Sequence, residues 1–172
     1  MKIAQPNRAL RQRRIAFAKQ LAAAAATNEL PVEFFTRLIW QESRFKPETV
    51  SRAGAQGVAR FMPGTANLRG FEDPFDPLEA IAKSAQLLRD LHREFGNLGL
   101  AAAAYNAGPG WVRDWLGGRR SLPGETRAYV RLVTGRSAEE WAGGQKDLVE
   151  TPVANGMPCF GSASLTGPAP ES

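Results

Sequence analysis

The chain has 172 residues, enough for one domain with a substantial core, and its formal net charge is +5. Ala and Leu are abundant while Thr, Val and Ile are sparse, which favours helices over sheet. One cysteine, Cys159, and one histidine, His92, exclude an internal disulfide and argue against tetrahedral zinc sites and histidine-based nucleophilic catalysis. The positive charge suits an anionic partner or simple solubility, and no zinc-ligand set, RNA-binding signature or lysine-rich tract favours nucleic acid.

The N-terminal segment, residues 1–29, is predicted to form an amphipathic helix over about residues 8–26. Its apolar residues recur at helical spacing, at Ile15, Ala18, Leu21 or Ala22, and Ala25. Four arginines precede this run, as in a signal peptide, but Lys19 and Gln20 interrupt the apolar stretch, so we prefer the helix. No stretch of the sequence is long enough to span a bilayer.

A second helix is predicted to start at Pro31, where proline is tolerated, and to end at Phe45-Lys46-Pro47. One face of this helix carries Phe35, Leu38, Ile39 and Glu42. Desolvation on an apolar face raises the pKa of a carboxyl group and keeps it protonated near neutral pH, as an acid catalyst of glycosidic bond cleavage requires. The alternatives for Glu42 are an ion pair with an arginine and a helix end turned to solvent.

The middle of the chain is predicted to contain a glycine-bearing loop, a short helix and a longer one. Residues 51–57 form the loop, and Thr65 is a candidate cap for the short helix that follows it. Asp76 begins the longer helix, with Glu79 completing a capping-box pattern and Gly96 stopping it. The apolar stripe of this helix is Leu78, Ile81, Ala85, Leu88, Leu91 and Phe95.

The remaining elements are short. Alanines at 101–104 predict close helix–helix approach, and further helices are expected over 109–116, 125–133 and 137–141, the last opening with a capping box at Ser137. The sequence after residue 143 is rich in Pro, Gly, Ser and Thr, which predicts a mostly disordered tail over 144–172. Residues 30–143 would then form the functional domain.

Four separated segments carry recognisable motifs: Gln41-Glu42-Ser43-Arg44-Phe45, then Ser51-Arg52-Ala53-Gly54-Ala55-Gln56-Gly57 with Phe61-Met62-Pro63-Gly64-Thr65-Ala66, then Ala103-Ala104-Tyr105-Asn106-Ala107-Gly108-Pro109-Gly110, and finally Glu125-Thr126-Arg127-x-Tyr129-Val130. In this order and spacing the set resembles the soluble lytic transglycosylase domain, the goose-lysozyme-like family that cleaves bacterial peptidoglycan. One segment alone is weak evidence, whereas the set is highly specific. The resemblance covers roughly residues 30–133 and implies a mainly α, lysozyme-like fold with a substrate cleft.

The resemblance also implies roles for individual residues. Glu42 matches the single catalytic acid of the family, and Ser51 matches a serine whose hydroxyl lies near the reacting sugar. Tyr105 matches a tyrosine that supports the glutamate and the transition state. From the residues alone, Ser51 is equally well a turn residue and Tyr105 an ordinary core aromatic.

Substrate contacts are implied by the same resemblance. Met62 matches an apolar residue that packs against the saccharide, while Ala104 and Asn106 help to shape the cleft. Glu125 matches an acid placed near the peptide stem, and Tyr129 is expected to be structural, with one face toward the groove.

One position departs from the family pattern. The family has Gly-Leu-Met-Gln before the apolar-Met-Pro motif, whereas this chain has Gly57-Val58-Ala59-Arg60. Arginine only donates hydrogen bonds and carries a fixed charge, whereas glutamine also accepts them. Arg60 is expected either to pair with Glu42 and lower its pKa, or to bind carboxylates of the glycan.

The family mechanism needs one carboxylate, because the muramoyl sugar's own 6-hydroxyl attacks the anomeric carbon and gives a 1,6-anhydro product. We therefore predict a peptidoglycan lytic transglycosylase without metal or cofactor. The alternatives are a hydrolytic muramidase, with Asp73, Asp76 or Glu79 as the base, and a catalytically weak peptidoglycan-binding module.

The expected partner is the glycan strand, not nucleic acid, and the expected location is the periplasm or cell envelope. We expect a monomer, with an association with secretion or flagellar machinery left open.

Overall fold

The computed structural model describes residues 8–144 and 147, and over these residues it is built from helices, with two isolated β-bridges in the loop after the second helix. A mainly α fold is therefore confirmed. The helices are α1 Arg8–Thr27, α2 Val32–Ser43, α3 Pro63–Leu68, α4 Pro77–Phe95, α5 Leu98–Ala107, α6 Pro109–Leu116, α7 Gly124–Thr134 and α8 Ala138–Ala142.

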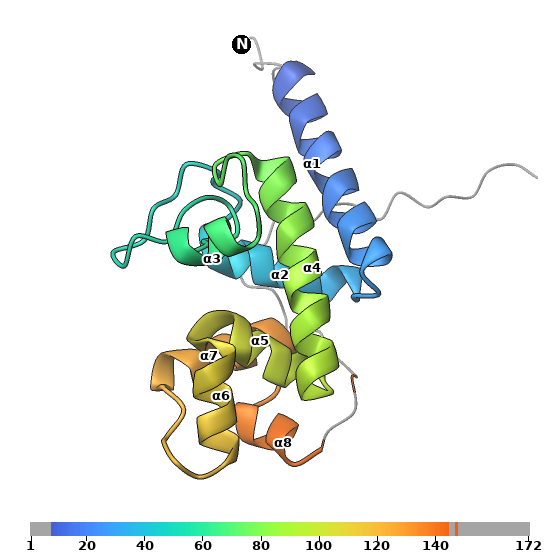
Figure 1. Ribbon diagram of the computed structural model, residues 1–172. Coiled ribbons are helices and arrows are strands. Elements are labelled where there is room, and N and C mark those ends of the chain that lie inside the picture. The colour runs from blue at the N-terminus through green and yellow to red at the C-terminus, as the bar shows by residue number, and fades with distance from the viewer. Residues whose placement is uncertain (1–7, 145–146, 148–172) are drawn as a thin grey trace, which may run out of the picture.

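Helix α4 connects two groups of elements. Figure 1 shows α1, α2 and α3 around one end of α4, and α5 to α8 gathered at its other end. Helix α5 packs against α4, α6, α7 and α8, while α2 packs against α7 across the boundary between the two groups. This α2–α7 contact places two of the motif-bearing segments side by side.

The predicted small-residue stripe of α5 lies at the centre of the core. All residues from Leu98 to Ala104 are buried, so α5 contacts its neighbours around its whole circumference. A Cβ atom on Gly99 would overlap the buried indole of Trp141, which explains why glycine stands there. The helix begins at Leu98, three residues before the predicted alanine run, because the side chain of Asn97 accepts a hydrogen bond from the Leu100 amide.

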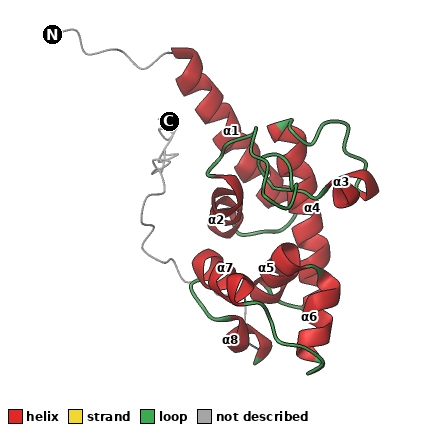
Figure 2. Ribbon diagram, turned by 90° about the vertical axis from the view of Figure 1, so that its left-hand side faces the viewer, coloured by secondary structure: helices red, strands yellow, loops and turns green. Residues whose placement is uncertain are grey.

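The predicted N-terminal helix is confirmed, but its packing differs from the expected stripe. Residues 8–16 are exposed, and Ile15, predicted to lie on the apolar face, exposes 46 % of its surface. Burial begins only at Leu21, Ala24 and Ala25. In Figures 1 and 2 the first turns of α1 accordingly extend beyond the other helices.

Two predicted helix caps are confirmed and two are wrong. Asp76 accepts a hydrogen bond from the Leu78 amide, and Ser137 forms a complete capping box. Thr65 lies inside α3, which begins at Pro63. Glu79 instead accepts the amide hydrogens of Glu72 and Asp73, at 3.0 Å each, so it holds the preceding loop rather than its own helix. Leu78, predicted to lie on the apolar stripe, is 48 % exposed.

Asp147 lies in the predicted tail yet contacts the helical core. One carboxylate oxygen accepts the Leu98 amide hydrogen at 2.7 Å, and the other lies 2.7 Å from His92 Nε2. Asp147 therefore satisfies a free amide at the start of α5 and brings negative charge to its positive end. Residues 145, 146 and 148–172 of the predicted tail, including Cys159, are outside the described residues.

Asp147→Ala is expected to lower the free energy of unfolding by about 1 kcal/mol, because an unsatisfied amide remains at the start of α5. Asp147→Asn is the matched control, since its amide oxygen still accepts the Leu98 hydrogen. Urea unfolding of the three proteins measures the effect. Equal stability of the alanine variant and the wild type would show that the Asp147 contact does not contribute.

Candidate active site

Glu42 stands in the last turn of α2, at the edge of the core. The preceding turns bury Phe34, Phe35, Leu38 and Ile39 completely, which fixes the rotation of the helix. The helix ends at Ser43, earlier than predicted, because Arg44 adopts a left-handed conformation with φ 54° and its amide returns to the Trp40 carbonyl. Glu42 is thus held on a regular helix directly before a sharp change of chain direction.

The environment of Glu42 raises its pKa. Burial is the main cause and lifts the pKa to about 7 from the ordinary value of 4.5, and the negative charge of Glu125 adds to it. The Tyr129 hydroxyl and the positive charge of Arg60 act in the opposite direction, and burial outweighs both. The raised pKa expected from the apolar helix face is found, and the expected lowering by Arg60 is present but smaller than the effect of burial.

Tyr129 makes the direct contact with Glu42. Its hydroxyl donates a hydrogen bond of 2.6 Å to Glu42 Oε1, and the ring is almost fully buried between α7 and the core. The sequence motifs predict a structural Tyr129 with one face toward the groove, and they do not predict this bond. The signal was the spacing of Thr126, Tyr129 and Val133 on one face of α7, which turns the phenol inward.

Tyr105 lies near Glu42 but has other hydrogen-bond partners. Its hydroxyl donates to the Ala59 carbonyl at 2.9 Å and lies 2.9 Å from Ser84 Oγ on α4. The pKa of Tyr105 is raised well above the ordinary value, by burial first and by the charge of Glu42 second. Tyr105 therefore ties the loop around Ala59 to α5, and among the described contacts no hydrogen bond joins it to Glu42.

The loop between α2 and α3 is tightly organised. Backbone bridges join Gln56 to Val50 and to Phe61. Gly57 has φ +77°, and a Cβ atom there would overlap the Pro74 carbonyl oxygen, so glycine is required. Ser51 Oγ accepts the Ala55 amide hydrogen at 2.9 Å, the geometry of a turn residue.

The other candidate residues differ in exposure. Met62 precedes α3 and is 45 % exposed, whereas Ala104 is buried in α5. Asn106 is exposed and accepts a hydrogen bond of 2.8 Å from the buried Thr126 hydroxyl, which links α5 to α7. Glu125 is exposed in the first turn of α7, close enough for its charge to act on Glu42.

The described residues contain neither a candidate metal cluster nor a candidate membrane-spanning helix. No cluster of three or more His, Cys, Asp or Glu side chains able to hold a metal ion occurs among them. None of their helices combines the length and apolarity needed to cross a membrane.

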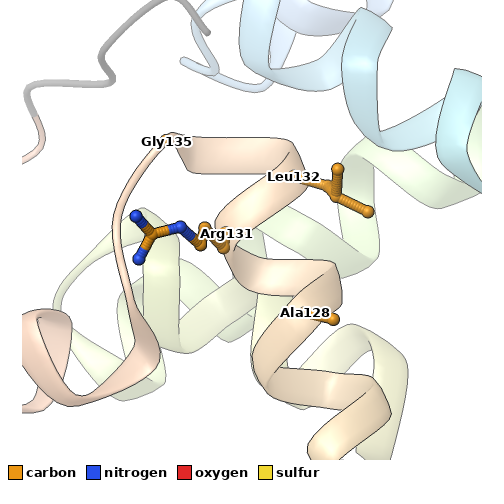
Figure 3. Close-up of a pocket in the computed structure, with 4 residues that line it drawn as sticks. All are labelled: Ala128, Arg131, Leu132 and Gly135. Carbon is orange, nitrogen blue, oxygen red and sulfur yellow. The ribbon is translucent and has the colours of Figure 1, made fainter.

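A shallow depression on α7 lies apart from the candidate site residues. It is lined by Ala128, Arg131, Leu132 and Gly135 (Figure 3). Arg131 and Leu132 are exposed, and the depression includes none of the candidate residues.

The family model of the transglycosylase SLT domain matches residues 19–127. The chain therefore belongs to this family. The match includes the described positions of Glu42, Ser51, Arg60, Tyr105 and Glu125 and ends two residues before Tyr129.

Individual relatives agree with the family match. The soluble lytic murein transglycosylase of Escherichia coli K12 is 37% identical over 127 residues, which are 61% of this chain and 20% of that protein. The transglycosylase of Enterobacteria phage PRD1 is 30% identical over 146 residues, 85% of this chain and 51% of that protein. The matched part of the chain thus spans 20% and 51% of the length of these two relatives.

The solved structure of the 70 kDa soluble lytic transglycosylase SLT70 from Escherichia coli has the same fold. It superposes with a TM-score of 0.62 at 31% sequence identity, covering 74% of this chain and 24% of SLT70. The mainly α, lysozyme-like architecture predicted from the motifs is confirmed.

Proposed function

We propose that this protein is a peptidoglycan lytic transglycosylase that cleaves the β-1,4 bond between N-acetylmuramic acid and N-acetylglucosamine. Glu42 first protonates the bridging oxygen as a general acid. It then takes the proton from the muramoyl 6-hydroxyl, which attacks the anomeric carbon and closes a 1,6-anhydro ring. No water is consumed, and no metal or cofactor takes part.

The observation that carries the proposal is the buried carboxyl of Glu42, which has a raised pKa and a hydrogen bond from Tyr129. A pKa of about 7 keeps much of the group protonated near neutral pH, and the same value makes its carboxylate a competent base. The hydrogen bond from Tyr129 fixes the carboxyl on one oxygen, Oε1, and leaves Oε2 for the proton that is transferred. The names of the relatives, soluble lytic murein transglycosylase and transglycosylase, support the same reaction.

The hydrolytic alternative needs a second carboxylate, and the three candidates for it are engaged elsewhere. Asp73 accepts the Phe75 amide hydrogen at 2.9 Å, and Asp76 accepts that of Leu78 at 2.9 Å. Both oxygens of Glu79 accept loop amides. These bonds hold the loop and the start of α4, so the side chains serve the backbone rather than an attacking water.

The remaining candidates take positioning and substrate roles in this proposal. Tyr105 and Tyr129 hold the reacting groups, and Ser51 lies on the loop that faces the reacting sugar. Contacts with the saccharide and its peptide are assigned to Met62, Ala104, Asn106 and Glu125. The substrate places the protein in the periplasm or cell envelope, where it acts as a monomer, alone or beside an envelope-spanning assembly.

Mass analysis of digested sacculi tests the proposal. Soluble muropeptides ending in 1,6-anhydro sugars, one water lighter than hydrolytic products, are the expected result. Reducing ends of full mass would identify a muramidase. Glycan binding without soluble products would identify a binding module and reject both enzymes.

Tyr129→Phe is expected to move the alkaline limb of activity to higher pH. The Tyr129 hydroxyl lowers the pKa of Glu42, so its loss raises that pKa, and kcat should fall about tenfold because the carboxyl is less well oriented. Rate against pH on sacculi measures both effects. Thr126→Ser on the same helix is the control, and an unshifted limb in Tyr129→Phe would contradict the coupling.

A further inference from the structure

We propose that Arg60 is a receptor for a carboxylate of the substrate, so that it selects charged muramoyl glycan over neutral chitin-type glycan. This inference rests on the proposed function for the choice of substrate, and it assigns a binding role to a residue at which the chain departs from its family. The carboxylate is that of a lactyl group on a stem-free muramoyl sugar or that of a peptide stem.

The first observation is that the Arg60 side chain lacks hydrogen-bond and ion-pair partners among the described residues, and its buried Nε–H is unsatisfied. Four other buried or half-buried arginines, Arg37, Arg69, Arg89 and Arg127, each form an ion pair with an acidic side chain. A half-buried cation with an unpaired donor costs free energy unless an acceptor arrives, and a carboxylate matches the arginine fork.

The second observation is that Arg60 is held in place. Its backbone is left-handed with φ 51°, an uncommon state for a residue with a side chain. Hydrogen bonds keep it there, from the Arg60 amide to the Gly57 carbonyl at 3.1 Å and between Gln56 and Phe61 at 2.8 and 3.0 Å. The Tyr105 hydroxyl fixes the adjoining Ala59 carbonyl. The guanidinium therefore projects from a preorganised turn, as a recognition group requires.

The third observation is position. Arg60 lies close enough to Glu42 for its charge to lower the Glu42 pKa, yet no ion pair joins the two side chains among the described contacts. Glu42 and Glu125 are acids near this position, and a pKa of about 7 leaves Glu42 only partly ionised at neutral pH. Neither acid forms an ion pair with Arg60 among the described residues, so the guanidinium remains available to the substrate.

Binding measurements test the assignment, with Glu42→Gln as the background so that no ligand is consumed. Three ligands of equal length separate the sources of charge. They are stem-free muramoyl strands with free lactyl carboxylates, stem-bearing strands with amidated lactyl groups, and neutral N-acetylglucosamine oligomers. Arg60→Gln is expected to lower affinity about tenfold for the strand that carries the recognised carboxylate, and to leave the neutral oligomer unchanged.

Two control variants keep the result interpretable. Arg60→Lys retains the charge without the fork and should lose less affinity than Arg60→Gln. Arg52→Gln removes an exposed cation from the same loop and should change nothing. A loss confined to stem-free strands identifies the lactyl carboxylate, and a loss confined to stem-bearing strands identifies the peptide. The proposal is overturned if Arg60→Gln binds each of the three ligands as tightly as the Glu42→Gln background does. It is also overturned if Arg60→Gln loses the same affinity for all three.

A pH profile gives an independent readout in the active protein. Glu42 is faced by Tyr129 and Glu125 from α7, by Arg60 from the loop and by Tyr105 from α5. Removing the Arg60 charge should move the alkaline limb of kcat/KM upward, because free enzyme loses a group that lowers the Glu42 pKa. The limb of kcat should move less, because the bound carboxylate already balances Arg60.

The two proposals fail separately. Arg60-dependent carboxylate binding in a protein that makes no anhydro product would reject the lytic function and keep the receptor. Anhydro products with Arg60-independent binding and coincident pH profiles would keep the function and reject the receptor.

Discussion

Glu42→Gln is expected to abolish the release of soluble muropeptides from sacculi, with a rate at least ~100-fold below that of the wild type. Glutamine can still accept the Tyr129 hydrogen bond, so the geometry of α2 and α7 should persist while the transferable proton is lost. Release of anhydro products by single-turnover digestion measures the effect, and circular dichroism checks the fold.

Glu48→Gln is the matched control for this experiment. Glu48 is an exposed acid in the loop that follows α2, six residues after Glu42, and no hydrogen bond or ion pair joins it to the candidate residues among the described contacts. Its replacement removes one negative charge and should leave the rate unchanged. A folded Glu42→Gln protein with near-wild-type turnover would remove Glu42 from the mechanism.

Most of the fold follows from local signals in the sequence. The ends of α4 and the start of α8 depend on contacts between residues close in sequence, so these boundaries were predictable. The residues are Asp76, Pro77 and Gly96 for α4, and Ser137 and Glu140 for α8. The hydrogen bonds of Glu79 were not predictable. Its partners are the amides of Glu72 and Asp73, on a loop whose path depends on tertiary packing. The exposure of Ile15 also depends on tertiary packing, because the sequence of α1 does not show which of its turns contact other helices.

In the candidate site, too, some features follow from local sequence and others from tertiary packing. The burial of Glu42 and its raised pKa follow from helical spacing within α2, and the motifs identified the segments that surround it. The packing of α2 against α7 determines which tyrosine hydroxyl contacts Glu42. Tyr129 donates the hydrogen bond to Glu42, whereas Tyr105 donates to the Ala59 carbonyl. Such pairings join residues 87 and 46 positions apart, a separation at which local sequence pattern carries no geometric information.

A stability measurement should show the energetic cost of holding Glu42 in this environment. Its pKa is about 7 in the folded protein against 4.5 ordinarily, so the folded state binds the proton more tightly than the unfolded state. The favourable contribution is therefore complete below about pH 4.5 and is lost as the pH rises through about 7. The difference corresponds to at most about 3 kcal/mol of unfolding free energy.

Glu42→Gln removes this titration, so the variant should be more stable than the wild type above pH 7 while losing activity. The gain should reach at most about 3 kcal/mol near pH 8, several degrees in Tm, and should shrink toward zero near pH 4. Urea unfolding of both proteins from pH 4 to 8 measures it, and Glu48→Gln should follow the wild-type curve throughout. A constant difference at every pH would mean that the substitution acts through packing. A variant less stable at pH 8 would mean that the ionised carboxylate is well solvated in the folded protein, and that Glu42 is not poised to hold a proton.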